Sequence, residues 1–432
     1  MHKPMSLAIL LGTFFALLAA GLPIAFALGL ASLAYMILFM PGVSLTIIPQ
    51  HIFAGADSFT LTAIPFFVLM GELMNAGGIS RRLVDFARTL VGHLRGGLGL
   101  VSLVASMIFA SFSGSAIANA VATGSVTIPS MIRAGYPRAL AAAIEGSASS
   151  LGAVIPPSIP MIVYGTLAGV SVGGLFAGGY VPALLMGLGL AVVIRAKAKR
   201  LGIQVQARAS WGEILQALRE SALALLTPVI VMGGILGGVM TPTEAGAVGA
   251  LYTLLMALLA YRELSWRDLP RILLNTALHT GVAMLVMTVA TAFSWIMAYE
   301  MIPNRVASAV LSSIQQPWLL MIAIVALLLV IGTFLDTISA LVILTPVLVP
   351  VATRVGIDPL FFGIIVTIAL TLAVLTPPVG VVLFVTSSTA GTTLEKTSRE
   401  VLLFLAVLVA GTLLCAVWPD LVMWLPRLLG FR

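Results

Sequence analysis

The sequence predicts an all-α polytopic membrane protein made of two inverted-topology repeats, each with a re-entrant helical hairpin and a discontinuous helix. Hydrophobic residues make up 60% of the 432 residues and charged residues only 9%. Many apolar runs reach about 20 residues, which is long enough to cross a bilayer. Between residues 110 and 160, a Gly/Ser cluster and a Pro-Pro pair interrupt this apolar sequence, and both interruptions return later, with 221 residues separating Pro156 from Pro377.

The first repeat is assigned to residues 1–194. Its segment 79–95 carries four arginines on a helical apolar pattern, so we expect a helix lying along the membrane surface. The arms of the hairpin are short for a full crossing and both outer ends carry arginine, which predicts a re-entrant loop. The expected order is spans at 5–20, 22–39 and 58–76, the surface helix, a hairpin at 97–132, a broken helix at 139–168 and a span at 174–194.

The first apolar run is expected to remain in the protein as a helix, although it resembles a signal peptide. Its end, 21–29, resembles 240–249 in the second half, and a cleaved peptide should have no such counterpart. A basic linker at 195–220 joins the two halves and is predicted to be cytoplasmic.

The second repeat, 221–432, is predicted to follow the same order as the first. It is expected to contain spans at 221–239, 244–261 and 273–301, a surface segment at 302–316, a hairpin at 318–353, a broken helix at 359–390 and a span at 401–425.

Arginine counts predict that the two repeats face opposite sides of the membrane. The first surface segment has four arginines, whereas its counterpart at 302–316 has one, Arg305. Basic residues collect on the cytoplasmic side, so the first copy is expected there and the second outside. Arg427, Arg432 and Lys3 lie on the outer side in this scheme, against the rule.

Several function classes are excluded by what the sequence lacks. No phosphate-binding Gly-x-x-x-x-Gly-Lys-Ser/Thr loop is present, so the chain is not expected to hydrolyse ATP. No hydrolase motif or cluster of metal ligands occurs, which argues against an enzyme. The single cysteine lies in an apolar run, and no basic, aromatic-rich patch suggests nucleic-acid binding.

The interruptions predict two equivalent cation sites, one per repeat. Backbone without helical hydrogen bonds exposes carbonyl oxygens, and broken helices hold Na⁺ in this way in secondary transporters. For an isolated Gly or Ser, close helix packing is the simpler interpretation. Here a hairpin, a polar tip and a Pro-Pro pair occur together in both halves of the chain, and this repetition favours a binding site. The candidate ligands are Ser113, Gly152, Ile155 and Pro157 in the first copy, and Gly332, Asp336, Ala373, Thr376 and Pro378 in the second.

Six ionisable residues in or beside apolar segments have both a functional and a structural interpretation. A carboxylate in the middle of a membrane segment costs at least about 2.5 kcal/mol, which favours a site role for Asp336 over a structural pairing with a nearby Arg or hydroxyl. For Glu145, a site role and a hydrogen bond to Ser147, Ser149 or another helix are about equally supported. Glu72, Glu244 and Glu300 are interpreted as structural, and helix–helix hydrogen bonding is the default for His279.

Seven segments of the chain resemble the large membrane subunit (DctM-like) of the tripartite ATP-independent periplasmic transporters, the TRAP family. They span nearly the whole chain in the order of the family, which makes the resemblance specific. They are 64–79 (IPFFVLMGELMNAGGI), 113–116 (SGSA), 155–160 (IPPSIP), 241–247 (TPTEAGA), 344–348 (LTPVL), 356–359 (GIDP) and 376–380 (TPPVG).

This resemblance implies a Na⁺-coupled, elevator-type importer of organic acids in a bacterial or archaeal inner membrane, with scaffold and transport domains. C4-dicarboxylates, sialic acids and other sugar acids are the implied substrates. A separate small four-helix membrane subunit and a soluble periplasmic substrate-binding protein are the implied partners, in addition to the lipid bilayer. The implied substrate residues lie between the two Na⁺ sites: Ser115, Asn119, Ser158, Asp336 and Thr337.

Two points stay open. Neither hairpin tip contains Lys or Arg, so a carboxylate must be recognised by hydroxyls, amide N–H groups, bound Na⁺, or an approach of Arg305 or Arg354. A stand-alone Na⁺/dicarboxylate symporter, working without a binding protein, is the alternative function. A channel, an intramembrane enzyme and a membrane anchor are less consistent with paired broken helices and an interior Asp336.

Overall fold

Every regular element in the described part of the chain is a helix. The computed structural model describes residues 3–203, 207–312, 314 and 316–431. The first half contains α1 (Lys3–Ala19), α2 (Ile24–Phe39), α3 (Ile47–Ala56), α4 (Ala63–Ala76), α5 (Ile79–Val91), α6 (Gly97–Ser113), α7 (Ala116–Arg133), α8 (Arg138–Ser150), the short η1 (Leu151–Ala153), α9 (Ile159–Ala168) and α10 (Val172–Arg200).

The second half starts with two long helices that lead into the membrane. It contains α11 (Trp211–Leu236), α12 (Pro242–Leu255) with the π-helical turn η2 (Met256–Ala260), α13 (Leu269–Tyr299), α14 (Ile302–Leu311), α15 (Pro317–Ile331), α16 (Thr337–Arg354), α17 (Pro359–Ala373), α18 (Val381–Ala390), α19 (Leu394–Val417) and α20 (Pro419–Leu428). Six of the described helices are long and apolar enough to cross a membrane, or seven if the bent pair of α4 and α5 is one span.

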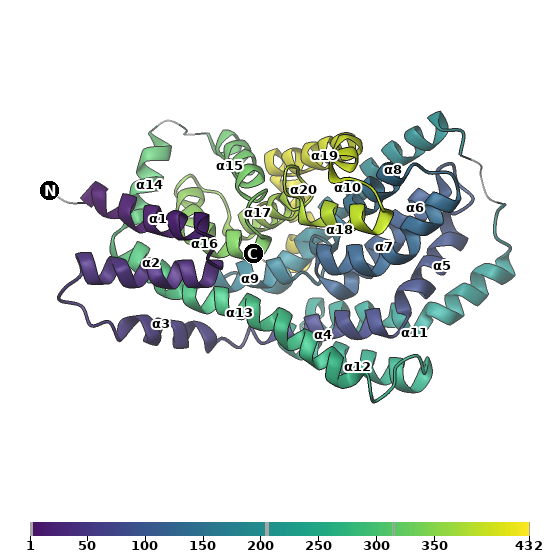
Figure 1. Cartoon of the computed structure of the whole chain (residues 1–432), viewed down its shortest axis with the longest axis horizontal. Coiled ribbons are helices and arrows are strands. Elements are labelled where there is room, and N and C mark those ends of the chain that lie inside the picture. The colour runs from purple at the N-terminus through teal and green to yellow at the C-terminus, as the bar shows by residue number, and fades with distance from the viewer. Residues whose placement is uncertain (1–2, 204–206, 313, 315, 432) are drawn as a thin grey trace.

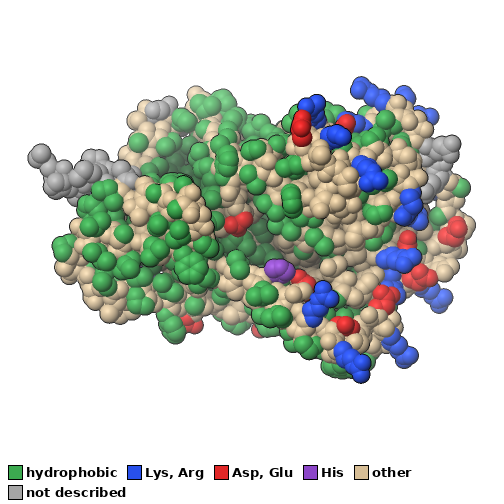
Figure 2. Space-filling view, viewed as in Figure 1, with side chains coloured by type: hydrophobic (Ala, Val, Ile, Leu, Met, Phe, Trp, Pro, Cys, Tyr) green, Lys and Arg blue, Asp and Glu red, His purple; other side chains and the backbone are tan. Residues whose placement is uncertain are grey.

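The two surface segments lie at opposite ends of the molecule (Figure 1). α5 turns away from α4 by 73° at Gly77 and Gly78, where Gly78 has a φ of 65° that favours glycine. Its arginines stay on one side because the apolar residues Ile79, Leu83, Val84 and Ala87 are all buried. α14, the counterpart, lies at the other end, and most Lys and Arg side chains in view gather in the half of the molecule that carries α5 (Figure 2).

Three boundaries differ from those expected. α3 was not predicted and occupies the stretch before the span expected at 58–76, which shortens to α4. The last expected span, 401–425, begins earlier as α19 and is divided at Trp418, because Pro419 disfavours a helical conformation in the residue before it. The linker at 195–220 is largely helical, since α10 continues to Arg200 and a capping box at Ser210 starts α11.

The structural interpretation of Glu244 is confirmed. Its carboxylate accepts hydrogen bonds from the Thr241 backbone N–H at 2.8 Å and the Thr241 hydroxyl at 2.9 Å, while the Glu244 N–H donates to that hydroxyl at 3.3 Å. This reciprocal pair satisfies donors that the first turn of α12 would otherwise leave unpaired. Glu244 therefore starts a helix that packs on α4.

The segment that follows each helix break packs on the other half of the chain. α18, from the second repeat, packs on α7 and α8 of the first, whereas α9, from the first repeat, packs on α16 and α17 of the second. The hairpins themselves are less alike: α6 and α7 pack closely along each other, but α15 and α16 make little mutual contact and both pack on α17. This packing across the halves brings the interrupted segments of both repeats to the centre of the fold.

Candidate functional site

The first hairpin tip lies against the first helix break. α6 ends at Ser113, Gly114 adopts φ 59°, and the extended Ser115 caps α7 by accepting from the Ala118 N–H at 3.4 Å. A Cβ on Gly114 would sit 2.8 Å from the Pro157 carbonyl oxygen, so only glycine fits this approach. The Ile159 N–H donates to the Gly114 carbonyl oxygen at 3.3 Å, which fixes the tip to the start of α9.

The unwound segment after α8 presents carbonyl oxygens that lack partners. No hydrogen bond from a described residue ends on the carbonyl oxygens of Gly152, Ile155 or Pro157. Gly152 lies close to the hairpin, because a Cβ there would be 3.2 Å from the Ser115 carbonyl oxygen. The structure thus brings the Ser113 tip and the three carbonyl-bearing residues predicted for the first cation site into one neighbourhood, with oxygen atoms suited to a small cation.

The second hairpin tip lies against the end of α17 in a related way. A Cβ on Gly332 would be 2.4 Å from the Ala373 Cβ, and the Thr337 hydroxyl donates to the Leu370 carbonyl at 3.5 Å. The Ala373 carbonyl accepts from the Thr376 N–H at 2.9 Å, which leaves one lone pair on that oxygen. Among the described residues, none donates to the carbonyl oxygens of Gly332 or Pro378. The Pro156–Pro157 and Pro377–Pro378 peptide bonds are both cis.

Asp336 has a local structural role in addition to its candidate role. Its carboxylate caps α16, accepting from the backbone N–H groups of Ile338 at 3.0 Å and Ser339 at 3.1 Å, and from the Ser339 hydroxyl. The side chain is otherwise exposed. A capping carboxylate with free lone pairs remains able to bind a cation.

A cavity of about 470 Å³ lies beside the first tip. Ser113, Ser115 and one face of α7 form one wall, and Ile159 and Ile338, from the first turns of α9 and α16, also line the cavity. The opposite wall comes from α4 and α13, which pack on each other. Its lining residues on these two helices are Ile64, Val68, Gly71, Glu72, Asn75, His279 and Ala283, at the spacing of single helix faces.

Four of the five expected substrate residues do not line this cavity, namely Asn119, Ser158, Asp336 and Thr337. Asn119 is fully buried inside the first hairpin, where its amide donates to the Ser106 carbonyl at 2.9 Å. Ser158 is fully buried and caps α9, and its hydroxyl donates to the Ala153 carbonyl at 2.5 Å. Both side chains are occupied by holding the backbone of the site, and only Ser115 of the implied substrate set lines the cavity.

The cavity contains a histidine–glutamate pair, His279 and Glu72, both of which were interpreted from sequence as structural. His279 Nδ1 lies 3.2 Å from Glu72 Oε1, which confirms helix–helix bonding for His279 and joins α13 to α4. No Lys or Arg lines the cavity. Arg354, one expected approach, instead bonds to α14, donating to the Asn304 carbonyl at 3.3 Å and the Ser308 hydroxyl at 3.2 Å. Arg305 lies on α14.

Helix N-termini give the site a positive character. α7, α9 and α16 all begin here, and the partial positive charge of a helix N-terminus favours anions. These helix ends, which suit an anion, therefore lie next to the residues predicted to bind Na⁺.

Glu145 holds the first hairpin to α8 through a set of hydroxyls. The side chain is fully buried, and its carboxylate accepts from Ser106 at 3.0 Å, Thr127 at 2.6 Å and Ser149 at 2.8 Å, as well as from Ser102 and Thr123. These donors come from α6, α7 and α8. The hydrogen-bond interpretation of Glu145 is confirmed, and it includes the expected neighbour Ser149.

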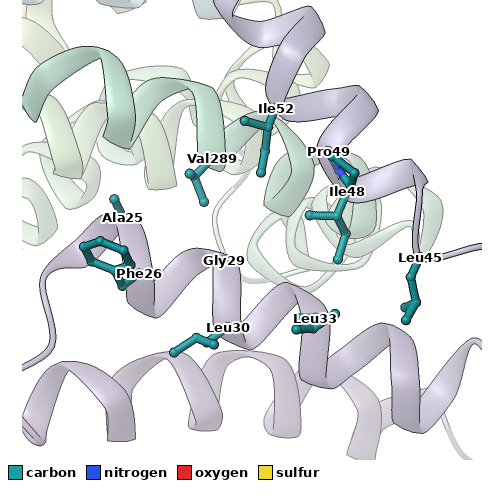
Figure 3. Close-up of a pocket in the computed structure, with 10 residues that line it drawn as sticks. All are labelled: Ala25, Phe26, Gly29, Leu30, Leu33, Leu45, Ile48, Pro49, Ile52 and Val289. Carbon is teal, nitrogen blue, oxygen red and sulfur yellow. The ribbon is translucent and has the colours of Figure 1, made fainter. Parts of the chain in front are cut away.

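A second hollow, between α2, α3 and α13, has a different character (Figure 3). It is lined by Phe26, Leu30, Leu33, Ile48, Val289 and other side chains that are almost entirely apolar. A surface of this kind offers no hydrogen-bonding group to an anion, so it is not a candidate for the transported solute.

Comparison with known proteins shows extensive similarity. The family description "Tripartite ATP-independent periplasmic transporter, DctM component" matches residues 11–421. The sialic acid TRAP transporter large permease protein SiaM of Vibrio cholerae is 40% identical over 96% of this chain and 97% of its own length. The C4-dicarboxylate TRAP transporter large permease protein DctM of Pseudomonas aeruginosa is 40% identical over 93% of this chain and 94% of its own length.

One solved structure supports the fold class. The Alcanivorax borkumensis YdaH transporter aligns with a TM-score of 0.62, covering 87% of this chain and 88% of its own. With 17% sequence identity, the likeness concerns the fold alone. The predicted all-helical membrane fold is confirmed.

Proposed function

The chain belongs to the DctM component family of the tripartite ATP-independent periplasmic transporters, and we propose that it couples the import of an organic acid to Na⁺ entry. It is a multi-pass inner-membrane permease subunit, not an enzyme. The observation that carries the proposal is the contact between each hairpin tip and a broken helix with unpaired carbonyl oxygens. Such oxygens suit Na⁺, and no ATP is required.

An organic acid is the solute class that fits the cavity. The similar permeases carry names that specify sialic acid and C4-dicarboxylate, both carboxylates. The three helix N-termini at the cavity favour an anion, and two bound Na⁺ ions would add positive charge beside it. Because the matching family is described as tripartite and periplasmic, we infer that a periplasmic substrate-binding protein delivers the solute and that a small four-helix membrane subunit completes the transporter.

The proposed movement is that of an elevator. Both hairpins and both broken helices form the transport domain, since α18 packs on α7 and α8 while α9 packs on α16 and α17. The scaffold contains α4, α12 and α13, which pack together. The opposite positions of α5 and α14 suit an inverted repeat (Figure 1). Na⁺ binding would shift the population toward the state that accepts solute.

Uptake into proteoliposomes tests the proposal. The chain, its small subunit and its binding protein would be supplied with radiolabelled succinate, N-acetylneuraminate or gluconate. We expect uptake of at least one solute that requires both an inward Na⁺ gradient and the binding protein. Uptake that needs Na⁺ but not the binding protein would favour the stand-alone symporter, and uptake unaffected by Na⁺ would refute the coupling.

Removing single hydroxyls from the two cation sites should weaken Na⁺ binding. Ser113→Ala and Thr376→Ala are each expected to raise the Na⁺ concentration for half-maximal uptake by about tenfold, because each removes one neutral oxygen ligand. Ser125→Ala and Thr389→Ala are matched controls. Their hydroxyls donate to the Ala122 and Val385 carbonyls at 2.9 Å each, as that of Thr376 does to Leu372 at 3.1 Å, but both residues lie within helices and not at a tip or break. Equal Na⁺ dependence in the site variants and their controls would exclude these ligands.

A further inference from the structure

The scaffold wall of the cavity carries a group that the transport domain lacks. Burial of an anionic solute requires donors or a compensating charge. On the transport-domain side the cavity presents hydroxyls and helix N-termini, with no Lys or Arg among its lining residues. The one basic side chain in the lining is His279 of α13, whose side chain is 66% exposed.

Glu72 fixes the orientation of His279. The 3.2 Å contact between His279 Nδ1 and Glu72 Oε1 uses one ring nitrogen, and Glu72 itself is only 23% exposed. No hydrogen bond from a described residue reaches His279 Nε2. When both nitrogens are protonated, Nδ1–H donates to Glu72 and Nε2–H is available to a ligand. A carboxylate partner that orients a histidine in this way is a common arrangement at binding sites.

We propose that His279, oriented by Glu72, binds the anionic group of the transported solute from the scaffold side of the cavity. This inference rests on the proposed function. The solute then bridges two parts of the fold: Ser115 holds it from the first hairpin, and His279 holds it from α13. Because the hairpin and α13 belong to different domains, the contact exists only in the conformation that places them together, so it contributes to solute affinity in one state of the cycle.

The location of His279 makes the test specific. His279 lies on the scaffold wall and outside both cation sites, so its loss should change solute affinity without changing Na⁺ affinity. His279→Gln preserves size and a hydrogen bond to Glu72 but removes the imidazole nitrogen Nε2 that faces the ligand. His279→Arg supplies guanidinium N–H donors in its place. His51→Gln is the control, because His51 stacks on Trp295 at 5.1 Å and does not line the cavity.

The experiment is a thermal-shift titration of the purified complex with its small subunit, in saturating Na⁺, using succinate, N-acetylneuraminate or gluconate, whichever the wild type binds. We expect His279→Gln to raise the Kd about tenfold, as loss of a charge-assisted hydrogen bond predicts. His279→Arg should restore the Kd to within about threefold, and His51→Gln should not change it. The Na⁺ concentration for half-maximal stabilisation should be the same in all four proteins.

Two results would overturn the inference: a Kd for His279→Gln equal to that of the wild type, or parallel losses of solute and Na⁺ affinity, which would indicate a structural role. Failure of the proposed function gives a different result, because the wild type itself would then show no Na⁺-dependent binding of any of the three acids.

Discussion

Asp336→Asn is expected to raise the Na⁺ concentration for half-maximal uptake by about 10- to 100-fold, the largest functional effect of any single substitution considered. Asparagine caps helices about as well as aspartate, so its side-chain oxygen can still accept from the Ile338 and Ser339 N–H groups at 3.0 and 3.1 Å. The substitution therefore removes the negative charge and leaves the start of α16 in place. Na⁺-dependent uptake into proteoliposomes measures the effect.

A matched control separates the charge at the tip from capping in general. Asp358 caps α17 by accepting from the Phe361 N–H at 2.9 Å, at the start of α17, whereas the second hairpin tip lies against the end of that helix. Asp358→Asn should retain the Na⁺ dependence of the wild type. If both variants lose Na⁺ affinity equally, or if Asp336→Asn loses none, then Asp336 is not a cation ligand and its role is limited to capping.

Features that depend on local chemistry could be predicted from the sequence. The tip of the first hairpin and the break after α8 follow from residues such as Gly114, Pro156 and Pro157, which restrict the backbone whatever surrounds them. The capping box at Thr241 is equally local. Consequently the all-helical membrane fold is confirmed, and the helix ends at Ser113, Ser150 and Ala373 fall at the predicted interruptions.

The sequence does not predict which neighbouring helix each helix face contacts, so features that depend on these contacts could not be predicted. Asn119 follows the tip by four residues, yet it turns into the hairpin and bonds to the Ser106 carbonyl. Glu72 and His279 are separated by about half the chain, and their meeting depends on the packing of α4 against α13. Periodicity identifies a helix face but does not identify its partner, so the scaffold wall of the cavity emerged only from the three-dimensional structure.

Each repeat contributes one acid that the other lacks, and the two acids have different surroundings. Ser115, which caps α7 as Asp336 caps α16, lies 221 residues before Asp336, and Val366 occurs 221 residues after Glu145. Asp336 is exposed at a tip, whereas Glu145 is enclosed by hydroxyls between three helices. We therefore expect the exposed acid to serve cation binding and the buried one to hold its three helices together. Glu145 should therefore affect stability more than recognition.

Glu145→Ala is expected to destabilise the folded protein by about 3–5 kcal/mol, because it removes a buried acceptor from five donors. Thr123 and Thr127 can turn to the backbone carbonyls of Asn119 and Thr123, at 2.8 and 3.0 Å. Ser102 and Ser149 are fully buried and have no second partner among the described residues, so their hydroxyls would remain unpaired. Thermal unfolding of the purified complex should show a melting temperature lower by roughly 10 °C.

The five hydroxyls that donate to Glu145 are called the hydroxyl cage below. Two further variants show whether this cage holds the helices together or whether the loss of any acid has the same effect. Glu145→Gln keeps the shape and one acceptor, and its amide can donate to the hydroxyl oxygens of Ser102 and Thr127, so it should lose less stability than Glu145→Ala. Glu244→Ala, which removes an exposed capping acid, should shift the melting temperature less than either. A Glu145→Ala protein as stable as the wild type would refute the cage as the connection between α6, α7 and α8. If the cage does connect them, the hairpin tip and the Gly152 break move as one body, because Ser106 and Asn119 link Glu145 to both.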